Sequence, residues 1–223
     1  MYAADLSAIS LDDFERTLLS VELIPSRRVL RDRISDVCRR LRDRGVDDLE
    51  GSRLLLRDKG GYPELAIELG VDVEYLTLLS REINSYRTRP LALARLAGLP
   101  SETLEALESV GIHTTEDLYE RAAGKRHRRK LAEALDLPEE RLMYALELSD
   151  LVRITGVGPA SAHVLHEIGI HGPRDYLATD SATIQQRYAD HTEATLGRRE
   201  VLGIADIDYC RRYCTALPDD IER

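Results

Sequence analysis

Apolar residues recur at three- and four-residue spacing along almost the whole chain, and alternating strand-like runs are few. This is the period of an amphipathic α-helix, so the sequence predicts an all-α protein. Helix starts are indicated by Ser10, which precedes Asp13 by three positions, and by Pro138 and Pro173. Helix ends are indicated by glycines suited to a left-handed C-terminal cap: Gly45, Gly70, Gly111 and Gly169. The pattern therefore predicts many short helices.

An internal repeat is visible in the same pattern. Residues 93–119 align without a gap on residues 151–177, at an offset of 58 positions. Upstream, residues 65–76 match residues 131–142 at an offset of 66. Self-similarity of this kind indicates a duplicated structural unit.

The second copy contains a compact turn sequence, Ile154-Thr155-Gly156-Val157-Gly158-Pro159. Gly156 can take the positive φ of a tight turn, and Val157 can fill the space between the two flanking helices. Pro159 suits the first turn of a helix, where its missing N–H does no harm. The unpaired amides of that helix start would point outward and could hold a phosphate.

Residues Leu151 to Ala162 resemble a helix-hairpin-helix motif, and residues 61–223 resemble a bacterial family of unknown function with tandem helix-hairpin-helix repeats. The resemblance implies an N-terminal helical extension over 1–60, a first repeat with a degenerate hairpin and a connector over 61–148, and a second repeat over 149–223. It also implies that main-chain atoms of the second hairpin hold one nucleic-acid strand, with a monovalent cation at the turn carbonyls of some members. By position, these contacts are Gly156, Val157, Gly158, Ala160 and Ser161.

The chain departs from that family pattern in both copies. A basic residue often follows the hairpin in members that bind nucleic acid, whereas this chain has Ala160, Ser161 and Ala162. In the first copy, the second glycine of the hairpin is lost and Glu102 places a negative charge where a phosphate would approach. The first hairpin is therefore expected to be structural.

The charge is unevenly distributed. With 31 Lys+Arg against 40 Asp+Glu, the net charge of −9 argues against coating of nucleic acid by bulk charge. Residues 121–130 nevertheless carry six basic and no acidic side chains. They form a candidate backbone contact through Lys125, Arg126, Arg128, Arg129 and Lys130, or a solvated connector between the repeats. The arginines of 27–44 are interleaved with Asp32, Asp36 and Asp43, which favours pairing on the helices.

Composition excludes several other classes. Aromatic residues make up only 5% of the chain, and there is no Trp, which argues against base stacking. No long uncharged apolar run and no secretory signal is visible, so no membrane contact is expected. Three cysteines suit a reducing compartment, and a cytoplasmic location is expected.

No metal site or cofactor is expected, because none of the histidines or cysteines has partners at a recognisable spacing. Packing or helix capping is the expected role of His113 and His171, and packing that of Cys210 and Cys214. His163 and His166 stand three positions apart but lack a third ligand at a recognisable spacing.

Two aspartates downstream of the second hairpin are candidates for a catalytic role. Base-excision glycosylases use a similar hairpin followed by a catalytic Asp, and Asp175 and Asp180 lie downstream of this one. Asp175 recurs as Asp117 in the first copy, which indicates a partner for a helix N-terminus. The sequence thus predicts a non-enzymatic protein that binds the DNA phosphate backbone weakly. The alternative is a protein-interaction or assembly scaffold without nucleic-acid binding, and the sequence sets no oligomeric state.

Overall fold

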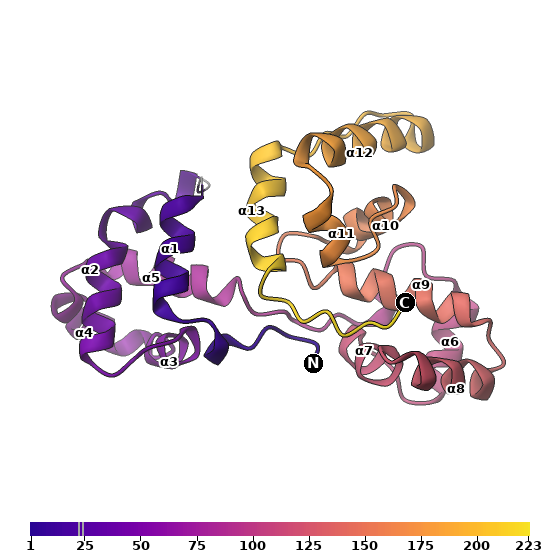
Figure 1. Cartoon of the computed structure of the whole chain (residues 1–223), viewed down its shortest axis with the longest axis horizontal. Helices are drawn as coiled ribbons and strands as arrows, with labels where there is room; N and C mark the ends of the chain where they lie inside the picture. The colour runs from indigo at the N-terminus through magenta and orange to yellow at the C-terminus, as the bar shows by residue number, and fades with distance from the viewer. Residues whose placement is uncertain (22, 24) are drawn as a thin grey trace. The chain divides into compact units, whose positions relative to one another are not determined.

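A computed structural model describes residues 1–21, 23 and 25–223 (Figure 1). Over these residues the chain is helical and contains no β-strand, which confirms the all-α prediction. The described residues form two isolated β-bridges, one between Ser10 and Asp48 and one between Ala92 and Thr114. Packing divides the chain into an N-terminal unit, Ala4–Arg87, and a C-terminal unit, Thr88–Arg223 with Met1–Ala3. The repeat boundaries at residues 60 and 148 stay predictions.

The described residues of the N-terminal unit form five α-helices and short 3₁₀ turns. The helices are α1 (Leu11–Ser20), α2 (Val29–Asp43), α3 (Leu49–Leu55), α4 (Tyr62–Leu69) and α5 (Val73–Asn84). The turns are η1 (Leu6–Ala8), η2 (Pro25–Arg27) and η3 (Lys59–Gly61). Helix α2 contacts α1, α4 and α5, and its apolar face, including Leu30, Ile34 and Val37, is fully buried. Ser10 caps α1 by accepting the amide of Asp13 at 3.1 Å, as predicted.

The arginines of α2 and its C-cap Arg44 are engaged within the N-terminal unit, some by acidic side chains and some by backbone carbonyls, as Arg40 is by that of Glu68 at 2.6 Å. Arg39 lies 2.8 Å from Asp36 in the same helix. Arg33 also lies 3.9 Å from Asp36, so the pairing along the helix that the sequence predicted is present. Further pairs lie between helices, since Arg42 reaches Asp12 and Glu15 of α1 and Arg44 reaches Glu68 of α4. This basic segment is therefore largely neutralised within its own unit.

The C-terminal unit contains eight α-helices and one 3₁₀ turn. They are η4 (Leu93–Arg95), α6 (Ser101–Ser109), α7 (Thr115–Ala122), α8 (Lys125–Leu135), α9 (Glu139–Leu151), α10 (Pro159–Glu167), α11 (Pro173–Ala178), α12 (Ser181–Leu196) and α13 (Ile204–Cys214). Helix α9 contacts α7, α8 and α10. Because it is surrounded, α9 buries residues on nearly all its faces, including the polar Ser149 and Asp150.

The duplicated sequence folds with matching backbone conformations. Gly98 and Gly156 both have positive φ, +79° and +94°, at the turn that precedes α6 and α10 respectively. Gly111 and Gly169 also match, at +77° and +85°, where these helices end. All four glycines predicted to end helices have positive φ.

The capping interactions are duplicated as well. Asp117 accepts a hydrogen bond from the amide of His113 at 3.1 Å, and Asp175 accepts one from the amide of His171 at 2.9 Å. Each carboxylate thus stabilises the start of the helix on which it lies.

Candidate functional site

The basic segment predicted from the sequence forms helix α8. Its charged residues favour helix formation, and Gly124 precedes the first turn without a side-chain cap. Lys125, Arg126, Arg129 and Lys130 are exposed and line one groove of about 560 Å³, together with Glu133 and Glu222. We call these four cations the α8 cationic face. The groove lining among the described residues thus has four positive and two negative side chains.

Three side chains of the α8 cationic face have no acidic partner. Arg129 lies 3.6 Å from Glu139, whereas Lys125, Arg126 and Lys130 form no ion pair within the described part of the chain. The backbone amide of Lys125 donates to the Glu222 carboxylate at 2.8 Å, so the C-terminal segment supplies the missing helix cap. Unlike the arginines of α2, these cations are available to an external anion.

Arg128 does not belong to this surface, although the sequence placed it there. Its side chain is 1% exposed and donates hydrogen bonds to the carbonyls of Ala122 at 3.0 Å, Ala123 at 3.2 Å and Glu222 at 2.6 Å. Arg128 therefore joins the end of α7 to the C-terminal segment. The side chain of Arg128 points inward, unlike those of its basic neighbours, because the helical period places position 128 on the side of α8 that packs against α7 and α9.

The second hairpin presents a helix start at the surface. The amide of Val157 donates to the carbonyl of Ile154 at 2.9 Å, which closes the turn. Gly158 is the N-cap of α10, and the first amide bonded within that helix is that of Ala162, to the Gly158 carbonyl at 2.8 Å. The preceding amides of Ala160 and Ser161 belong to the unsatisfied first turn. A Cβ added at Gly158 would meet nothing within 4 Å, so the space before these amides is open.

The surroundings of the second hairpin are apolar and acidic. Val157 and Ser161 line a small cavity of about 60 Å³ with Leu202, Asp206 and Cys210, and no cation lines this cavity among the described residues. No described residue lines both this cavity and the α8 groove. The structure thus gives two separate surfaces where the sequence suggested one combined contact.

The first hairpin is covered. A Cβ at Gly98 would lie 2.4 Å from His163 Nδ1 and 2.6 Å from the hydroxyl of Tyr144. Glu102, at the start of α6, forms an ion pair with Arg141 of α9. This hairpin turn packs against α9 and α10, in line with the structural role expected of it.

The two aspartates downstream of the second hairpin accept hydrogen bonds at helix starts. Asp175 holds the amide of His171, and Asp180 accepts the amide of Thr183 at 2.9 Å as the N-cap of α12. Hydrogen bonds from the side chain and the backbone amide of Thr183 lower the pKa of Asp180 below its usual value.

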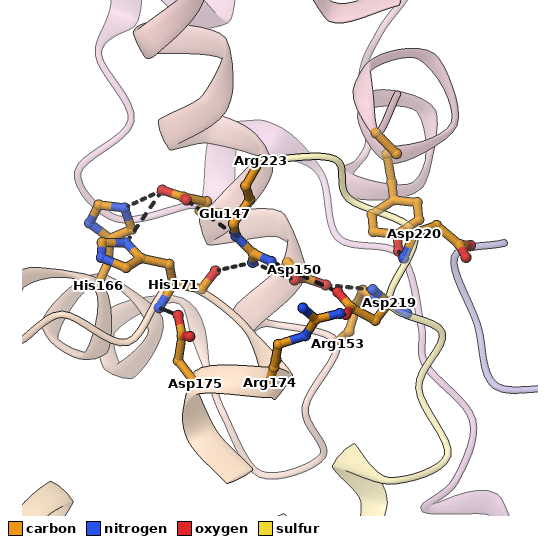
Figure 2. A network of polar contacts seen from close by, with 12 residues as sticks. Glu147, Asp150, Arg153, His166, His171, Arg174, Asp175, Asp219, Asp220 and Arg223 are labelled. Carbon is orange, nitrogen blue, oxygen red and sulfur yellow. Dashed lines mark hydrogen bonds and ion pairs between the residues drawn. The ribbon is translucent and has the colours of Figure 1, made fainter. Parts of the chain in front are cut away.

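A polar network links α9 to the C-terminal segment (Figure 2). Asp150 and Arg153 are 2% exposed each and lie 2.5 Å apart, and Arg223 Nη2 lies 3.5 Å from the other Asp150 oxygen. Arg153 also stacks on Tyr119, with 4.4 Å between the guanidinium carbon and the ring centroid. Burial raises the pKa of the Asp150 carboxyl to about 6, since desolvation outweighs the attraction of the two guanidinium groups.

One cluster in this network was missed by sequence reasoning: Glu147, His166 and His171. Glu147 Oε2 lies 2.9 Å from His166 Nε2 and 3.4 Å from His171 Nδ1. The two imidazole rings meet edge to face, with centroids 4.5 Å apart. Glu147 lies one helix earlier than the histidines, so no local spacing in the sequence signals the cluster.

The terminal cysteines lie outside any such cluster. Cys210 and Cys214 are buried on α13, and burial raises their thiol pKa to about 11 and about 12. Such thiols stay protonated and unreactive near neutral pH.

No helix in the described part of the chain combines the length and the apolar character needed to cross a membrane.

Comparison with known proteins gives one assignment. No curated protein and no solved structure matches the chain significantly. A family model, described as a domain of unknown function (DUF4332), matches residues 97–213, which is more than half of the chain and lies within the C-terminal unit. The chain therefore belongs to the DUF4332 family of domains of unknown function.

Proposed function

We propose that this protein binds the phosphate backbone of nucleic acid weakly and without sequence preference, and that it performs no catalysis itself. The observation that carries the proposal is the α8 cationic face. Lys125, Arg126 and Lys130 are exposed cations without an acidic partner among the described residues, in a protein of net charge −9. In a chain with an excess of carboxylates, a face of this kind is suited to an external polyanion.

The chemistry of this face favours phosphates over bases. None of the described residues that line the groove is aromatic, so none could stack on a base. If two to four phosphates are neutralised, the logarithm of the binding constant should fall with the logarithm of salt concentration with a slope of about −2 to −4. Binding should therefore be measurable at low salt and fade near physiological ionic strength.

The second hairpin is proposed as an additional contact, by the helix-hairpin-helix interpretation of residues 151–162. Its support is the positive φ of Gly156, the open space before Gly158 and the unsatisfied amides at the start of α10. These amides can hold a phosphate without side-chain charge. Because the hairpin and the α8 groove share no lining residue, each contact can be removed by its own substitution.

The test is fluorescence anisotropy of labelled single-stranded and duplex DNA at low salt. The charge-reversal variant is Lys125→Glu, Arg126→Glu and Lys130→Glu, and the hairpin variant is Gly158→Glu. A control with the same net charge is Arg57→Glu, Arg81→Glu and Arg187→Glu, three exposed positions outside α8 that form no ion pair among the described residues. Circular dichroism checks that each variant is folded.

We expect the α8 variant to lose most of the binding and most of the salt dependence, since each lost phosphate contact reduces the slope by about 1. The control should bind like the wild type, apart from a small nonspecific loss. No binding of the wild type to either DNA would overturn the proposal and favour the protein-interaction scaffold. Equal losses in the α8 variant and the control would overturn the assignment to α8. Unchanged binding by Gly158→Glu would remove the hairpin from the proposal.

A further inference from the structure

We propose that Glu147, His166 and His171 form a binding site for one divalent transition-metal ion of the zinc class. This inference is independent of nucleic-acid binding. The three residues come from three successive segments of the C-terminal unit: α9, α10 and the turn that precedes α11 (Figure 2). A metal at this point would therefore cross-link the helices around the second hairpin.

The spacing of the donor atoms fits a tetrahedral ion. Zinc binds imidazole nitrogen and carboxylate oxygen at about 2.0–2.2 Å, which separates neighbouring ligand atoms by about 3.3 Å. Glu147 Oε2 lies 2.9 Å from His166 Nε2 and 3.4 Å from His171 Nδ1. All three donor atoms lie within 4.8 Å of one another. The two distances from Glu147 are thus within a few tenths of an ångström of ligand spacing.

The donor set identifies the class of ion. Two imidazoles and one carboxylate match a common set of zinc ligands and leave a fourth position for water. Calcium and magnesium prefer oxygen ligands throughout, so a site with two nitrogen donors disfavours both.

One of the three donor atoms, Nδ1 of His171, forms no hydrogen bond with the described residues. His171 Nδ1 is buried and has no hydrogen-bond partner among the described residues, although the Glu147 carboxylate lies 3.4 Å away. Buried polar atoms in proteins are almost always satisfied. A metal ion placed among the three residues would be bound by this nitrogen. It would also be bound by the Glu147 oxygen that lies close to both imidazole rings.

The surroundings hold the three side chains in place. His171 is fixed by the hydrogen bond of its amide to Asp175, and Glu147 Oε1 lies 3.7 Å from Arg223 Nε. His166 Nδ1 faces the Glu167 carboxylate at 4.0 Å. Outer carboxylates next to ligand imidazoles are typical of metal sites. The positive charge of Arg223 opposes a dication, so we expect a moderate rather than a very tight affinity.

The experiment uses the whole chain after treatment with a chelator. Zinc chloride is titrated by calorimetry, and cobalt(II) is added to read the ligand type from its visible absorption. The main variant is His171→Ala, since this side chain is 39% exposed and its loss should be tolerated by the fold. His166→Ala and Glu147→Gln are the second and third variants. The matched control is His113→Ala, at the equivalent position of the first repeat.

We expect one zinc ion per chain, and binding at least about 10-fold weaker in each of the three variants, since even outer-shell changes cost 10–100-fold. His113→Ala should bind like the wild type. Cobalt should give a tetrahedral spectrum without a thiolate band, because the buried cysteines are not ligands. Absence of zinc binding in the folded wild type would overturn the proposal. So would equal binding by the wild type and His171→Ala, or a thiolate band with cobalt.

Discussion

The backbone amide of Lys125 donates a 2.8 Å hydrogen bond to the carboxylate of Glu222, so a residue 97 positions later caps the basic helix α8. Glu222 also lines the groove of the α8 cationic face. A carboxylate thus occupies the helix start that would otherwise attract a phosphate. This relationship connects the fold of the C-terminal segment to the charge of the proposed binding surface.

Glu222→Gln should tighten DNA binding. The amide oxygen of glutamine can still accept the Lys125 hydrogen bond, while one negative charge leaves the groove. The gain should be at most about fivefold, since two unit charges 4 Å apart in water interact by about 1 kcal/mol. Anisotropy titration at low salt measures it, with Glu108→Gln as a control at an exposed position on α6. Equal effects of the two substitutions would contradict the role of Glu222.

Arg128→Leu should destabilise the protein, whereas Arg126→Leu should not. Loss of the Arg128 guanidinium leaves the carbonyls of Ala122, Ala123 and Glu222 without their donor. We expect a drop of about 2–4 kcal/mol in the free energy of unfolding, since each buried group without a partner costs about 1–3 kcal/mol. The exposed Arg126 should change stability by less than about 0.5 kcal/mol. Urea unfolding compares the two variants, and similar midpoints would contradict the inward placement of Arg128.

Gly156→Ala should be more costly than Gly158→Ala. At Gly156, φ is +94° and a Cβ would lie 2.7 Å from Cys210 Sγ, so we expect a loss of about 1–3 kcal/mol. At Gly158 a Cβ meets nothing within 4 Å, and the loss of a glycine N-cap should cost less than about 1 kcal/mol. Thermal unfolding measures both. A larger loss at Gly158 would also disqualify the Gly158→Glu variant as a binding test.

Asp136→Gly should stabilise the protein. Asp136 ends α8 at φ +52°, and at the matching position of the upstream repeat Gly70 ends α4 at φ +66°. Glycine adopts this conformation without the steric cost of a Cβ, so we expect a gain of about 0.5–1 kcal/mol. Ala134→Gly, inside α8, is the control and should cost about 1 kcal/mol. Chemical unfolding that shows a loss for Asp136→Gly would contradict the prediction.

Asp150 should make the stability of the protein depend on pH between about 4 and 6. Its pKa is raised to about 6 in the folded chain, against about 3.9 in the unfolded chain, so the folded state binds more protons in this window. Its contribution to stability is thus complete below pH 4 and declines as pH rises toward 6. The unfolding free energy of the wild type minus that of Asp150→Asn should fall by up to about 3 kcal/mol across this range.

Asp180→Asn serves as the control for this pH effect. The pKa of Asp180 is lowered, so its contribution is present above its unfolded pKa and is lost as pH falls. The corresponding difference for Asp180→Asn should therefore be nearly constant between pH 4 and 6 and should fall only as the pH drops below about 4. Urea titrations at a series of pH values test both, and a pH-independent difference for Asp150→Asn would contradict the burial argument.

Local features of the chain were predictable from its sequence. The helical period, the cap at Ser10 and the left-handed conformations of Gly45, Gly70, Gly111 and Gly169 depend on neighbouring residues only. The duplication likewise reappears in the matching φ values of Gly98 and Gly156, because the same short sequence closes the same turn.

Other features depended on packing between segments that lie far apart in the sequence. The sequence could not distinguish the buried Arg128 from its exposed neighbours, since only the contacts of α8 with α7 and α9 decide which side of the helix is covered. Glu147 meets His166 and His171 only because α9 packs against α10.

The sequence by itself thus determined the all-helical class, the repeat and the conformations of its turns, since these follow from side-chain periodicity and from backbone preferences over a few residues. The tertiary structure alone decided which cationic side chains are exposed, as those of Lys125 and Arg126 are. It also decided which are buried and paired inside the protein, as those of Arg128 and Arg153 are. The physical reason is that a charged side chain can bind a partner only if the fold neither buries it nor pairs it with an opposite charge. Burial and pairing depend on residues that lie far apart in the sequence, so no local pattern reveals them.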